Sequence, residues 1–168
     1  MQNNDKDVLV YSKGFKWLHW LVAILVLGML AVGFFLSDMP SGFKATAYML
    51  HKSTGLTILG LMLVRAVWMI VSGKPKLPES VPKWECFLAS AVQYALYVFL
   101  IAMALSGWLM ATASNKIPVY FGWFRVPFPG LLPNEKIADW MYSTHGTLAW
   151  IILGLVFLHI AGALKHWL

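Results

Sequence analysis

The stretch from Thr144 to His166 reads THGTLAWIILGLVFLHIAGALKH, and it decides the fold class. At about 1.5 Å per residue it is long enough to cross the hydrocarbon core of a bilayer as a helix. It belongs to one of four long apolar stretches, at 16–36, 47–71, 85–112 and 140–167. Backbone polar groups must be satisfied internally in lipid, and these runs are too long for barrel strands. We therefore predict four transmembrane helices.

The composition of the whole chain agrees with a membrane location. The 168 residues are 60% hydrophobic and only 12% charged, whereas an average soluble domain has about 25% charged residues. The net charge of +6 does not predict nucleic-acid binding, because the Lys and Arg residues lie in short gaps between apolar runs. We predict one all-α membrane domain over residues 1–168, a four-helix bundle whose main surroundings are the lipid bilayer.

The loop charges predict the orientation of the bundle. A cytoplasmic N-terminus leaves more basic residues inside than outside and makes the C-terminus cytoplasmic too. The inner set is Lys6, Lys13, Lys16, Arg65, Lys74, Lys76, Lys83 and Lys165, and the outer set is Lys44, Lys52, Lys116, Arg125 and Lys136. A cleaved signal peptide is the alternative for the first stretch, but the run is long and no clear cleavage site ends it. The aromatic connection 113–139 is expected either to cover the outer end of the bundle or to anchor at the interface.

Histidines are the ionisable residues of interest, because placing such a residue inside a membrane is costly and usually functional. In the predicted orientation, His51 and His145 lie near the outer face, and His19 and His159 lie near the inner face. His145 and His159 are fourteen residues apart, which places them within about 40° on one helix face and about 21 Å apart along the axis. One helix can therefore offer a ligand to each of two stacked cofactors.

Two histidine pairs on different helices predict two b-type haems with bis-His ligation. A bare zinc or copper ion would need three or four ligands within a few ångströms, which two distant pairs do not supply. Cys86 is the single cysteine, so covalent attachment through C-x-x-C-H is excluded and the haems would be held non-covalently. The predicted iron ligands are His19, His51, His145 and His159.

Three other residues are expected near the haems. Gly55 lies one turn after His51, where a missing side chain leaves room for a flat ring. Arg65 shares the face of His51 and lies near the inner cofactor, where a haem propionate would be its partner and snorkelling to head groups is the alternative. His166 is near the membrane edge, where a propionate, a quinone or water would be its contact.

Several short motifs occur together in order: W-L-H-W at 17–20, H-K-S-T-G at 51–55 with L-V-R ending at Arg65, and T-H-G-T with F-L-H-I-A-G-A-L-K-H in the last stretch. With these motifs the chain resembles the bacterial cytochrome b561 family of four-helix dihaem proteins. The resemblance touches three of the four helices. It implies axial ligands from helices one, two and four, matching the four histidines above, and a location in the bacterial inner membrane.

The resemblance also implies electron transfer between the quinone pool (ubiquinone or another quinone) and a donor or acceptor outside. Superoxide oxidation coupled to ubiquinone reduction is an activity attributed to such proteins, so a quinone-linked oxidoreductase is expected. The outer basic residues would steer a small anionic donor. A cytochrome b subunit of a larger dehydrogenase and a non-redox haem-binding structural bundle stay open as alternatives.

A quinone head group needs hydrogen-bond partners inside an apolar cleft. The inner end offers such partners near His19, Arg65 and His166, and we expect the quinone there. The outer end offers an alternative set in Lys52, Trp140 and Ser143.

Overall fold

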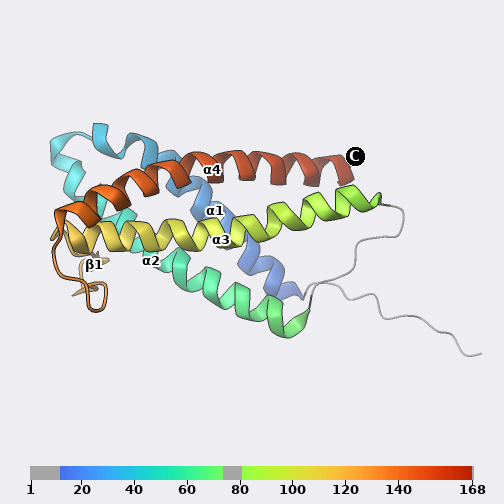
Figure 1. Cartoon of the computed structure of the whole chain (residues 1–168), viewed down its shortest axis with the longest axis horizontal. Helices are drawn as coiled ribbons and strands as arrows, with labels where there is room; N and C mark the ends of the chain where they lie inside the picture. The colour runs from blue at the N-terminus through green and yellow to red at the C-terminus, as the bar shows by residue number, and fades with distance from the viewer. Residues whose placement is uncertain (1–11, 74–80, 168) are drawn as a thin grey trace, which may run out of the picture.

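The computed structural model describes residues 12–73 and 81–167, and these form a bundle of long helices (Figure 1). Four of the helices are long and apolar enough to cross a membrane, which confirms the predicted fold class. The last helix ends beside the C-terminus in Figure 1, at the end of the bundle away from the small sheet. In chain order the elements are α1 (Lys13–Phe35), η1 (Leu36–Asp38), α2 (Ser41–Ser72), α3 (Lys83–Ala113), β1 (Val119–Tyr120), β2 (Phe124–Arg125) and α4 (Glu135–Trp167).

Local capping explains where the helices begin. The side chain of Ser12 accepts a hydrogen bond from the backbone N–H of Phe15 at the start of α1. Asn134 does the same for Ile137 at the start of α4. Pro40 and Pro82 stand directly before α2 and α3, where the fixed φ of proline suits a helix start. Polar first turns therefore extend α2 and α4 several residues ahead of the apolar stretches at 47 and 140.

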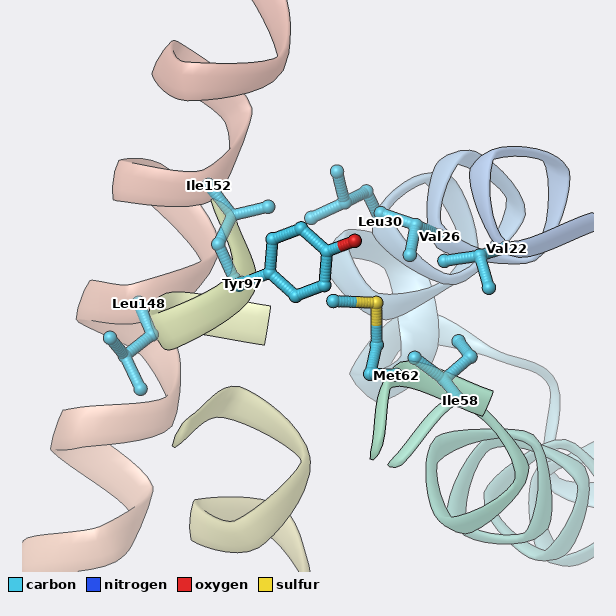
Figure 2. Close-up of a cluster of buried hydrophobic side chains, with 8 residues drawn as sticks. All are labelled: Val22, Val26, Leu30, Ile58, Met62, Tyr97, Leu148 and Ile152. Atoms are coloured by element: carbon cyan, nitrogen blue, oxygen red, sulfur yellow. The ribbon is translucent and has the colours of Figure 1, made fainter. Parts of the chain in front are cut away.

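The helices pack unequally. In the described part of the chain, close backbone approaches join α3 with α4, α1 with α2, and α2 with α3. Neither α1 nor α2 packs closely along α4, so side chains fill the space between them. Figure 2 shows the buried cluster that connects the helices. Its members are Val22, Val26, Leu30, Ile58, Met62, Tyr97, Leu148 and Ile152.

A small antiparallel hairpin, β1 paired with β2, closes one end of the bundle. Its turn contains Phe121 and Gly122, both with positive φ. The buried hydroxyl of Ser53 on α2 accepts the backbone N–H of Phe121 at 2.9 Å, and the Tyr120 hydroxyl lies 3.1 Å from that of Thr57. The connection 113–139 thus folds back onto α2. We call this end, with β1 and β2, the hairpin end, and the opposite end the far end.

Candidate functional site

Four histidines meet as two pairs, one toward each end of the bundle. The ring centres of His51 and His145 are 6.3 Å apart, with an interplanar angle of 72°. Those of His19 and His159 are 6.0 Å apart at 69°. These are the pairs that the sequence predicts from helix direction alone. All four side chains are half-buried.

The helices position each pair across the loosest part of the bundle. α4 carries one member of both pairs, while α2 supplies His51 and α1 supplies His19. Because neither α1 nor α2 packs its backbone closely against α4 in the described residues, each pair joins helices whose axes stand apart. Such spacing is what a flat cofactor between two ligand-bearing helices requires.

The two pairs are separated by apolar side chains. Met62, Tyr97 and Ile152 belong to the buried cluster between them, with exposed fractions of 2%, 8% and 1%. Figure 2 shows the Tyr97 ring lying between Ile152 of α4 and Met62 of α2. This cluster keeps water out of the region between the two histidine pairs.

At the hairpin end, α3 holds the ring of His145 although it carries no histidine. The Nδ1 atom of His145 lies 3.1 Å from the carbonyl oxygen of Met103 and 3.0 Å from the hydroxyl of Ser106. A Cβ atom built on Gly107 would approach His145 Cε1 to 2.9 Å, so only glycine leaves room for the ring. The sequence did not predict a role for Met103, Ser106 or Gly107, because a serine followed by a glycine in an apolar helix is not specific for any site.

At the far end, Arg65 of α2 lies against the histidine pair, as its place on the helix face predicted. Its Nη1 atom lies 2.5 Å from Nδ1 of His19. The guanidinium also lies over the rings of Phe15 and Tyr97, at 4.9 and 5.5 Å from their centroids. The Nε atom of Arg65 is buried and has no hydrogen-bond partner among the described residues.

Two of the remaining predicted site residues, Gly55 and Lys52, contact neighbouring segments of the chain. Gly55 faces Met29 of α1, and a Cβ atom there would lie 3.9 Å from the Met29 methyl group. His166 lies in the last turn of α4, but its side chain is outside the described residues. Lys52, next to His51, donates from Nζ to the carbonyl of Lys116 at 2.8 Å.

The donor set fits haem. A metal bonded at about 2 Å to one nitrogen of each imidazole would hold the two ring centres roughly 6 Å apart, close to the separations of 6.0 and 6.3 Å. No three His, Cys, Asp or Glu side chains gather into a metal site within 12–73 and 81–167, and two imidazoles fit a cofactor that brings its own equatorial nitrogens. His51 Nδ1 and Arg65 Nε are buried without partners in the same range, as groups facing a cofactor would be.

Comparison with known proteins gives the family. The sequence profile described as prokaryotic cytochrome b561 matches residues 10–168. A protein of Escherichia coli (strain K12) named cytochrome b561 homolog 2 is 36% identical over 150 residues, which cover 88% of this chain and 79% of that protein. The match spans all four helices and both histidine pairs. The chain therefore belongs to the prokaryotic cytochrome b561 family, as a multi-pass inner-membrane protein that binds haem b and transfers electrons.

Proposed function

We propose that this protein carries two b-type haems, each held by two histidines, and passes electrons across the membrane between them. The single observation that carries the proposal is the pairing of His51 with His145 and of His19 with His159 at opposite ends of the bundle. One haem supplies one-electron chemistry at each end. The chain supplies the ligands, the apolar separation and, at Arg65, a buried cation for a propionate or an electron-rich ligand.

The hairpin end would face the outside of the cell and both termini the cytoplasm, which follows from the bias of basic residues. The outer surface carries Lys52 and Lys116 near the His51–His145 pair, joined by the hydrogen bond from Lys52 Nζ to the Lys116 carbonyl. Two cations near one haem favour a small anionic donor, and superoxide is the candidate of this class. The electron would leave the protein to a quinone in the membrane.

The quinone would bind at the far end, near His19, Arg65 and His166. This end combines the polar Arg65–His19 contact with neighbouring aromatic rings, which a quinone head group and ring would use. The alternative at the hairpin end uses Lys52, Trp140 and Ser143. Against it, Lys52 already donates to Lys116, and the side chains of Trp140 and Ser143 are exposed on α4.

A haem count and a redox assay test the proposal together. Purified protein should contain two haems per chain by the pyridine haemochromogen assay, with low-spin bis-His spectra for both. In right-side-out vesicles, superoxide added outside should reduce both haems, and a ubiquinone analogue should reoxidise them. One haem per chain would contradict the ligand assignment, and haems inert to quinone and quinol would favour the structural bundle. Copurification of a peripheral redox subunit would favour the dehydrogenase alternative.

The quinone position needs its own variants. His166→Ala should slow reoxidation by the quinone analogue while both haem spectra stay unchanged. Ser143→Ala, at the hairpin end of the membrane, is the matched comparison and should reoxidise at the wild-type rate. The reverse pattern would move the quinone site to the hairpin end.

A further inference from the structure

The environment of the His145 ring differs from that of its partners. Its Nδ1 atom faces two oxygens of α3, the carbonyl of Met103 and the hydroxyl of Ser106. The Nδ1 of His51 is buried without a partner, and that of His19 faces the guanidinium of Arg65. Among these three rings in the described chain, only His145 faces hydrogen-bond acceptors from a neighbouring helix.

The chemistry of these oxygens determines which nitrogen of His145 carries the proton. A carbonyl oxygen only accepts, so the 3.1 Å contact with Met103 requires a hydrogen on Nδ1. The Ser106 hydroxyl donates its own hydrogen to the same carbonyl at 2.8 Å. Its oxygen therefore acts as an acceptor for Nδ1–H at 3.0 Å. With Nδ1 protonated, Nε2 of the neutral ring keeps its lone pair and is the nitrogen available to iron.

Burial protects the hydrogen bonds of the His145 ring from water. The Ser106 side chain is only 4% exposed, so water does not compete for its hydroxyl. The ring also packs against Gly107, the next residue of α3, with no space for a Cβ atom. Two successive residues of a helix that carries no ligand thus hold one ligand ring by hydrogen bonding and by shape.

We propose that Ser106 is a positioning residue for the haem at the hairpin end: with the Met103 carbonyl it holds His145 in the ligating tautomer and sets the reduction potential of that haem. The inference rests on the proposed dihaem function and adds a role for α3. Donation from Nδ1–H to oxygen acceptors makes the imidazole a more basic ligand, which favours ferric iron and lowers the potential. Ser106 contacts the ring of His145 and lies toward the opposite end of the bundle from the His19–His159 pair, so a haem held by that pair should not respond to it.

The test is a spectroscopic redox titration of the haem-loaded full chain. Ser106→Ala should shift the potential of the hairpin-end haem upward, leave the far-end haem unchanged, and speed haem transfer from the hairpin end to apomyoglobin several-fold. The haem that disappears in His145→Ala identifies the hairpin-end signal. Ser106→Thr, which keeps the hydroxyl, should return the potential toward wild type.

Ser114→Ala is the matched control, because the Ser114 hydroxyl also bonds to carbonyls of α3 but its partners, Met110 and Ala111, lie in the helix that it caps and not on a histidine of another helix. Its potentials should equal those of wild type. The inference is overturned if the hairpin-end haem has the same reduction potential in Ser106→Ala as in Ser114→Ala. It is also overturned if Ser106→Thr shifts that potential as far as Ser106→Ala does, because the effect would then come from packing and not from the hydroxyl. A wild-type protein with fewer than two haems would instead overturn the proposed function, so the two failures are distinguishable.

Discussion

His19 and His159 bring their ring centres within 6.0 Å of each other although their helices, α1 and α4, have almost no close backbone contact in the described chain. His51 and His145 repeat this relationship between α2 and α4 at 6.3 Å. Two helices whose backbones stand apart yet whose imidazoles converge can offer two axial ligands to one cofactor. Both pairs take one histidine from the same face of α4, His145 toward one end of the bundle and His159 toward the other.

The pairing predicts which haem each histidine supports. His145→Ala should remove the spectrum of one haem and leave most of the other, because its partner His51 cannot alone hold a low-spin bis-His site. His19→Ala should remove the other haem. Low-temperature absorption and EPR spectra of the two variants measure this. Loss of the same haem in both variants would contradict the pairing.

The close packing of Gly107 against the His145 ring predicts that a larger residue there weakens haem binding. In Gly107→Ala the new methyl group would meet His145 Cε1 at 2.9 Å, so the ring must move. Overpacking of this kind typically costs about 1–3 kcal/mol, and here the displaced atom belongs to a ligand. We expect loss or weakened binding of the hairpin-end haem, seen as reduced haem content per chain.

Gly154→Ala on α4 is the control, since nothing lies within 4 Å of the Cβ position there. Alanine is also the better helix former by about 1 kcal/mol, so this variant should keep both haems. Equal haem content in the two variants would show that the contact between Gly107 and His145 does not matter for haem binding.

The histidine pairs and the position of Arg65 were predictable because helical periodicity and span direction determine them. Residues fourteen apart, such as His145 and His159, share a face whatever surrounds them. Alternating span direction then puts His51 beside one and His19 beside the other. Arg65 lies at the His19–His159 pair, against His19 Nδ1, and its pairing with a haem propionate stays a prediction.

The role of α3 and the hairpin could not be predicted from periodicity. Ser106 and His145 are separated by 39 positions, and Ser53 and Phe121 by 68, so each contact depends on how two distant segments dock. A serine inside an apolar helix usually bonds its own backbone, as Ser106 also does through the carbonyl of Met103. Nothing in the local sequence shows that the Ser106 hydroxyl also reaches a ring on another helix.

The hairpin should depend on Ser53. This fully buried hydroxyl accepts the backbone N–H of Phe121 at 2.9 Å and lies 3.2 Å from the carbonyl of Val119. Ser53→Ala leaves a buried N–H unsatisfied, which costs about 1–3 kcal/mol. Local opening of the hairpin should then release the backbone of the exposed Arg125 from its pairing with Val119, and limited trypsin digestion should cleave there faster.

Thr147→Ala is the comparison for Ser53→Ala, because the Thr147 hydroxyl bonds to Ser143 within α4 and does not contact the hairpin. Its cleavage rate at Arg125 should match wild type. If Ser53→Ala also cleaves at the wild-type rate, the hydrogen bonds from α2 do not hold the hairpin closed.

Arg65 should raise the potential of the far-end haem. A cation beside the ligand His19 stabilises the reduced, more electron-rich site, and its partial burial among Phe15 and Tyr97 limits screening by solvent. Arg65→Gln keeps a hydrogen-bond donor but removes the charge. The potential of that haem should fall by on the order of tens of millivolts, given about 59 mV per tenfold change for one electron.

Arg65→Lys separates charge from hydrogen-bond geometry. Lysine retains the positive charge without the planar guanidinium. The reduction potential of the far-end haem in Arg65→Lys should therefore lie nearer to wild type than in Arg65→Gln. The haem lost in His19→Ala identifies the signal to follow, and the hairpin-end haem serves as the internal reference in every titration. A fall confined to the hairpin-end haem, or equal potentials in Arg65→Gln and wild type, would show that the guanidinium does not act on the haem beside His19.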